Sequence, residues 1–158
     1  MKNRIILMFA VVLLAVMLPA CQSHFISDRQ VRKSVHEAFE ARRAHFTQGD
    51  IFGIFEQELT TEEREAMEFL YSAMSSADMG DYQGEYFLDN VRMSLKARRQ
   101  MAWGEQVPED IFRHFVLPIR VNNERLDDFR MMYYDTLRKR VEGMSLHDAA
   151  LEVNHWCH

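Results

Sequence analysis

The chain has 158 residues, of which 47% are hydrophobic, and a formal net charge of −5 at pH 7. Loss of an N-terminal leader containing Lys2 and Arg4 takes that charge to −7. This balance excludes nucleic acid as a partner, which would need a basic face, and argues against electrostatic docking on anionic lipid. Glycine and proline are scarce, and Met, Leu, Glu, Arg and Ala are plentiful, which predicts an all-α fold.

The N-terminal residues 1–20 have the pattern of a bacterial lipoprotein signal peptide. A basic start precedes the apolar stretch Ile5 to Leu18, whose length is typical of a secretory signal. The expected cleavage motif comes next and consists of Leu18, Pro19 and Ala20, directly before Cys21. A membrane-spanning helix would need about 20 apolar residues, so this shorter stretch argues against a transmembrane anchor. An ordinary secretory signal prefers a small residue at the position of Leu18, so this residue argues against that alternative.

Cys21 is therefore the predicted lipidation site, and membrane lipid is the predicted partner of the acylated residue. Residues 21–27 are expected to be a lipidated tether, and residues 28–158 a helical domain. Gln22 is not the acidic residue that retains some lipoproteins at the inner membrane. The predicted location is the cell envelope, with the outer membrane favoured.

Apolar periodicity predicts an irregular bundle of about six helices after the signal peptide. In chain order, we expect a helix that is capped by Ser27 or Asp28 and ends at Gly49, and then an apolar turn at 51–55. A second helix starts at Thr60, and a third has an apolar face that begins at Phe87. Further helices are expected to start at Pro108, at Asn122 or Asn123, and at Ser145.

Several of these helices carry patterns that predict caps and faces. Thr60 and Glu63 have the spacing of a capping box. The expected inward residues of that helix are Ala66, Phe69, Leu70, Ala73 and Met74. A basic group is expected to form a solvated face and consists of Arg92, Lys96, Arg98 and Arg99. The long helix has an apolar stripe of Leu126, Phe129, Tyr133 and Leu137, and Gly143 is expected to end it.

Near the C-terminus, Glu152, His155, Cys157 and His158 resemble metal ligands in type, but no partner motif occurs elsewhere in the chain. Cys157 and His158 are neighbours, so on a helix they diverge and cannot act as nucleophile and base. We therefore expect Cys157 to be a buried structural thiol. The sequence predicts no catalytic residue, no metal site and no cofactor.

The apolar pattern of the last helix continues to the final residue, which favours the hypothesis that this chain is the front part of a longer protein. Two segments support the hypothesis of a longer parent protein. Leu117 to Glu124 with the helix through Tyr134, and Ala149 to His158, resemble the region before the catalytic core of bacterial transglutaminase-like lipoproteins.

That resemblance implies a helical leader followed by a papain-like α+β core with a Cys-His-Asp triad. All three triad residues would lie after His158, so none is assigned to this chain. The resemblance further implies that the parent acts on peptide or amide bonds and that its downstream core packs against this part. The alternative is a complete small all-α envelope lipoprotein that acts as a binding or assembly module, and a metal-binding bundle is a third option.

Overall fold

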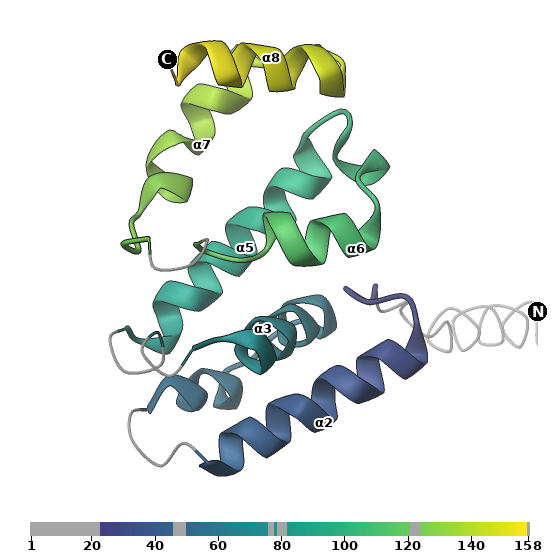
Figure 1. Cartoon of the computed structure of the whole chain (residues 1–158), viewed down its shortest axis with the longest axis vertical. Helices are drawn as coiled ribbons and strands as arrows, with labels where there is room; N and C mark the ends of the chain where they lie inside the picture. Colours follow the sequence, from purple (N-terminus) through teal and green to yellow (C-terminus); the bar gives the residue numbers. More distant parts are fainter. Residues whose placement is uncertain (1–22, 46–49, 76–77, 79–81, 121–123, 158) are drawn as a thin grey trace, which may run out of the picture.

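The computed structural model describes residues 23–45, 50–75, 78, 82–120 and 124–157, and these form helices without a strand (Figure 1). The predicted all-α class is therefore confirmed. The elements are α2 (Arg29–His45), η1 (Asp50–Glu56), α3 (Thr61–Ala73), α5 (Gly84–Gln100), η2 (Gly104–Gln106), α6 (Glu109–Ile111), η3 (Phe112–Val116), α7 (Phe129–Arg140) and α8 (Leu146–Trp156). The segments η1 and η2 are 3-10 helices, and η3 is a π-helix.

The hydrophobic core is centred on Tyr71 of α3, whose side chain is fully buried. The rings of Phe39, Phe52, Phe55 and Phe87 surround it at centroid distances of 5.4 to 6.4 Å. The Tyr71 hydroxyl donates to the carbonyl of Ile51 at 3.0 Å, which fixes η1 against α3. The predicted apolar turn at 51–55 is thus confirmed as a helical turn inserted into the core.

The predicted start signals of three helices are confirmed. Asp28 accepts from the backbone N–H groups of Gln30 and Val31 at the start of α2. The capping box of α3 is complete, because Thr60 and Glu63 each accept from the other's backbone N–H. Ser145 caps α8. The predicted stop at Gly49 lies outside the described residues.

The expected solvated face of α5 is confirmed for Arg92 and Arg99, whose side chains are 47% and 56% exposed, whereas Lys96 and Arg98 are half-buried. Arg92 pairs with Glu63 and Arg99 with Glu62, each at 2.7 Å, so these arginines join α5 to the first turn of α3. Arg98 lies over the Phe112 ring and Lys96 over the Tyr134 ring, at 4.7 and 4.5 Å. Exposed ion pairs contribute little to stability, and a cation over an aromatic ring contributes about 0.5 to 1 kcal/mol, but each of the four side chains contacts a neighbouring helix.

The expected α7 differs from the observed helix in its start and in its inward face. The helix begins at Phe129 after Asp128, while Leu126 is buried in the preceding coil and Phe129 is 59% exposed. The proposed caps Asn122 and Asn123 lie outside the described residues. Tyr134 is the buried side chain of the helix, one residue from the expected Tyr133.

Arg130 explains why the inward face of α7 is shifted. Its guanidinium donates to the carbonyls of Val116 and Pro118 at the end of η3, at 2.9 and 2.8 Å, and to the Ser94 hydroxyl of α5 at 2.5 Å. Burial lowers the pKa of Arg130, although a guanidinium remains charged. One polar side chain therefore joins three helices. On α3 a smaller error occurs, because Ala73 is exposed whereas Met67 and Tyr71 are buried.

Candidate functional site

The residues that follow Cys21 are packed into the fold. Phe25 is 2% exposed and Ile26 is fully buried, so part of the segment expected to be a tether between lipid and fold contributes to the core. The Phe25 ring meets Phe69 of α3 and Phe112 of η3 edge-on, with centroid distances of 6.3 and 6.0 Å. The fold therefore begins before residue 28, the expected boundary of the helical domain. We call residues 23–28 the N-terminal latch.

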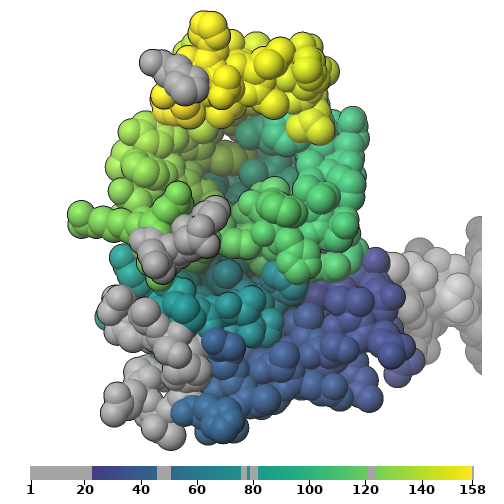
Figure 2. All heavy atoms as spheres, in the orientation of Figure 1, coloured from purple at the N-terminus to yellow at the C-terminus, as the bar shows by residue number. Residues whose placement is uncertain are grey.

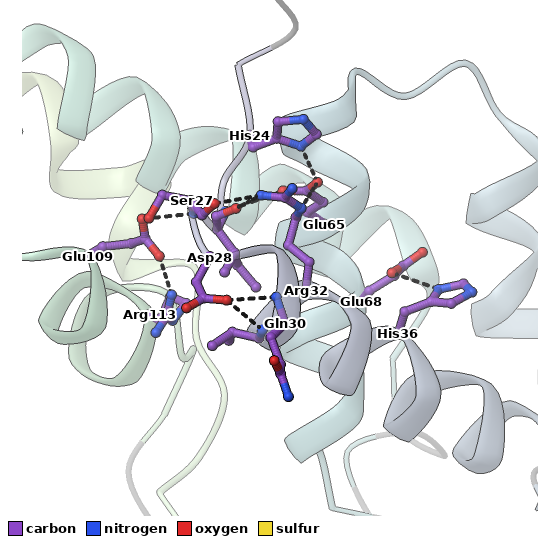
Figure 3. A network of polar contacts seen from close by, with 12 residues as sticks. His24, Ser27, Asp28, Gln30, Arg32, His36, Glu65, Glu68, Glu109 and Arg113 are labelled. Atoms are coloured by element: carbon purple, nitrogen blue, oxygen red, sulfur yellow. Dashed lines mark hydrogen bonds and ion pairs between the residues drawn. The ribbon is translucent and has the colours of Figure 1, made fainter.

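Glu65 of α3 is the polar centre of the latch (Figure 3). Its carboxylate lies 2.5 Å from Nδ1 of His24 and accepts from the backbone N–H of Ile26 at 3.2 Å. Nε of Arg32 on α2 lies 3.6 Å from the same carboxylate. Arg32 also donates to the carbonyls of Ile26 and Ser27, at 2.5 and 2.9 Å. The backbone of the latch is thus held by one acid and one base from different helices.

A second acid connects the latch to α6. The backbone N–H of Ser27 donates to Glu109 at 3.0 Å, and Glu109 also pairs with Arg113 of η3. Asp28 completes this end by capping α2, and the backbone N–H groups of Val31 and Gln30 lower the pKa of its carboxyl group. The latch is therefore bound to three helices, through Arg32 of α2, Glu65 of α3 and Glu109 of α6 (Figure 3).

Beside the latch, a groove of about 450 Å³ lies between α2 and α3. Two carboxylates form its floor, since Glu65 and Glu68 have side chains only 15% and 12% exposed. The rim is basic: Lys33 is 76% exposed, and His36, at 55%, places Nδ1 3.1 Å from Glu68. Arg29, Arg32 and Arg64 also line the groove. The exposed part of the groove therefore carries mainly positive charge.

The predicted lipidation site adjoins this region in the sequence. Leu18, Pro19, Ala20 and Cys21 lie outside the described residues, which begin at Ser23. Within the described part of the chain, no helix has the length and apolarity to cross a bilayer.

The C-terminal candidate residues do not form a site. Cys157 is exposed, so the expected buried thiol is wrong. Glu152 pairs with Arg140 of α7, and His155 is exposed. His158 is outside the described residues. Over the described ranges, no three His, Cys, Asp or Glu side chains are grouped closely enough to hold a metal ion.

The latch was missed at the sequence level because its contacts join distant positions. His24 and Glu65 are 41 residues apart, and Ser27 and Glu109 are 82 apart. A local signal for burial is nevertheless present, since Phe25 and Ile26 form an apolar pair that is separated from the cap Asp28 only by Ser27.

No protein-family model matches the chain, and neither a curated protein nor a solved structure is significantly similar to it.

Proposed function

We propose that this chain is the helical N-terminal part of a lipid-anchored envelope protein of the transglutaminase-like class, and that it has no active site of its own. The observation that supports an anchoring role is that the latch, which is buried in the fold, follows almost directly after the expected acylation site Cys21. After the expected cleavage, only Cys21 and Gln22 would separate the acyl chains from Ser23, the first described residue, and two residues span at most about 7 Å. A fold joined this closely to a lipid anchor is held at the membrane surface.

The Cys21→Ser variant tests the anchor. Without the thiol, no acyl chain can be attached, so the protein should lose labelling by a fatty-acid analogue in cells and leave the membrane fraction. Cys157→Ser is the matched control, because it removes the exposed thiol at the other end of the described chain. Retained labelling of Cys21→Ser would overturn the proposed anchor.

The class is supported by the segments that resemble transglutaminase-like lipoproteins and by exposed apolar side chains on or beside those segments. Leu146 and Leu151 of α8 are 43% and 56% exposed, and Phe129 and Met132 of α7 are exposed as well. A downstream core packed on α7 and α8 would cover such side chains. A downstream reading frame without a Cys…His…Asp order, or a stop codon directly after His158, would contradict this assignment.

The alternative, a complete binding or assembly module, is favoured by an apolar groove. A groove of about 570 Å³ is lined by Trp103, Leu137, Val141 and other residues from the end of α5, from α7 and from α8. Figure 2 shows a hollow beneath α8, drawn in yellow, between the light green α7 and the teal end of α5. A complete module predicts a monodisperse mature chain that unfolds cooperatively, whereas a missing core predicts binding of apolar dyes and self-association.

A further inference from the structure

The charge of the protein is distributed unevenly, and α2 is basic in an otherwise acidic chain. Residues 29–45 contain five Arg and Lys residues against two Glu residues, while the whole chain has a net charge of −5. The overall charge, which argues against docking on anionic lipid, therefore does not describe the helix that follows the latch.

One edge of α2 carries most of this charge. Arg29, Arg32, His36 and Arg43 are separated by three, four and seven residues, and such spacings place them along a single side of the helix. Lys33 lies beside them. We call these five residues the basic edge. Its first four members in sequence line the groove between α2 and α3.

The acids facing the basic edge are already engaged. Glu65 and Glu68 on α3 lie at the floor of the groove, paired with His24, Arg32 and His36. The acids of α2 and η1 pair along the surface: Lys33 with Glu37 at 3.6 Å, and Arg43 with Glu40 and Glu56 at 4.0 and 3.6 Å. Exposed pairs of this kind are weak and exchange readily with other anions. No hydrogen bond or ion pair of the Arg29 side chain is seen among the described residues, and Arg29 is exposed.

The position of these cations is unfavourable for the helix itself. Arg29 and Arg32 lie in the first turn of α2, followed by Lys33, and that turn contains no acidic residue. The N-terminal end of a helix carries partial positive charge, so cations there destabilise it. The helix dipole therefore does not explain Arg29 and Lys33 at the start of α2, whereas Arg32 is accounted for by its bonds to the latch and to Glu65. An anionic partner outside the protein would account for Arg29 and Lys33.

We propose that the basic edge of α2 docks on the phosphate headgroups of an anionic bilayer, so that α2 lies along the membrane that holds the acyl chains of Cys21. This inference rests on the proposed lipid anchor, which brings the start of α2 to the surface through the rigid latch. Arginine binds phosphate with two parallel N–H groups, and lysine binds it as a point charge. A helix of this length covers about 25 Å of membrane surface.

The test uses the lipidated protein reconstituted in vesicles. A fluorophore is placed on Ala44→Cys, an exposed residue at the far end of α2, in a Cys157→Ser background. Vesicles of phosphatidylcholine, or of phosphatidylcholine with 30% phosphatidylglycerol (about 3 in 10 lipids), contain a headgroup nitroxide that quenches at short range. Docking predicts stronger quenching in the anionic vesicles, and its loss in 0.5 M salt, where about 4 Å of screening length remains.

The double variant Arg29→Gln/Lys33→Gln should reduce the docking equilibrium by about 25-fold, since each basic residue near an anionic surface contributes about fivefold. The matched control is Arg125→Gln/Lys139→Gln, which removes the same charge from exposed positions outside α2. Equal quenching in both kinds of vesicle, or equal effects of the two double variants, would overturn the docking surface. Fatty-acid labelling of the same preparations reports separately on the anchor, so failure of docking and failure of lipidation are distinguishable.

Discussion

The most direct test of the latch is Phe25→Ala. Phe25 is 2% exposed and packs edge-on against Phe69 and Phe112, so the substitution empties a site within the core. Replacing a buried phenylalanine by alanine costs about 3 to 5 kcal/mol, of which each edge-on ring pair supplies about 1 kcal/mol. With a urea dependence of about 2 kcal/mol per molar, a loss of about 4 kcal/mol lowers the unfolding midpoint by about 2 M.

The measurement is urea unfolding of the whole chain followed by circular dichroism, together with amide hydrogen exchange of residues 23–28. Phe115→Ala is the control, because the same atoms are removed from a side chain that is 77% exposed, and its cost should stay below about 0.5 kcal/mol. If Phe25→Ala and Phe115→Ala unfold at the same urea concentration with unchanged exchange, the latch does not contribute to the fold.

Two further predictions concern buried polar groups. Arg130→Met leaves the carbonyls of Val116 and Pro118 without their donor and should lower the free energy of unfolding in urea by about 3 kcal/mol. Arg130→Lys should not restore the lost stability, because lysine lacks the planar fork of the guanidinium. Full stability of the lysine variant would contradict this role of Arg130. Burial raises the pKa of Tyr71 above its usual value of 10.0. A group whose pKa is raised on folding stabilises the protein fully at pH values below its unfolded-state pKa. This stabilisation falls as the pH rises above that pKa. The wild type should therefore lose about 1.4 kcal/mol per pH unit more than Tyr71→Phe above pH 10, and parallel pH profiles would refute this.

Local chemistry made a large part of the fold predictable. The capping box at Thr60 and Glu63 depends on residues three positions apart, and so does the cap of α8 at Ser145. The apolar cluster at 51–55 was correctly predicted as a core turn, because such density of Ile and Phe has a large cost in water. These features were accessible because the interacting groups lie within one helical turn of each other.

The differences on α7 and α5 share a physical origin in charged residues that pack. Along α7, Arg130 and Tyr134 lie on the inward face, but because Arg130 is polar the apolar pattern favours Phe129 and Tyr133, one position away. On α5, the four basic residues expected on a solvated face each have an acid or an aromatic ring as partner, and Lys96 and Arg98 are half-buried. Hydrophobic periodicity does not detect a charged side chain that packs inward because hydrogen-bond acceptors or aromatic rings surround it.

The sequence by itself determined the helical class, the main caps and the expectation of a lipid anchor at Cys21, since these depend on composition and on neighbouring residues. Only the tertiary structure decided that residues 23–28 are part of the fold and that α2 presents a basic edge beside them. The reason is that the burial of Phe25, the pairing of Glu65 with His24 and the exposure of Lys33 depend on which helices pack together. Those meetings join positions up to 82 residues apart, beyond the reach of any local pattern.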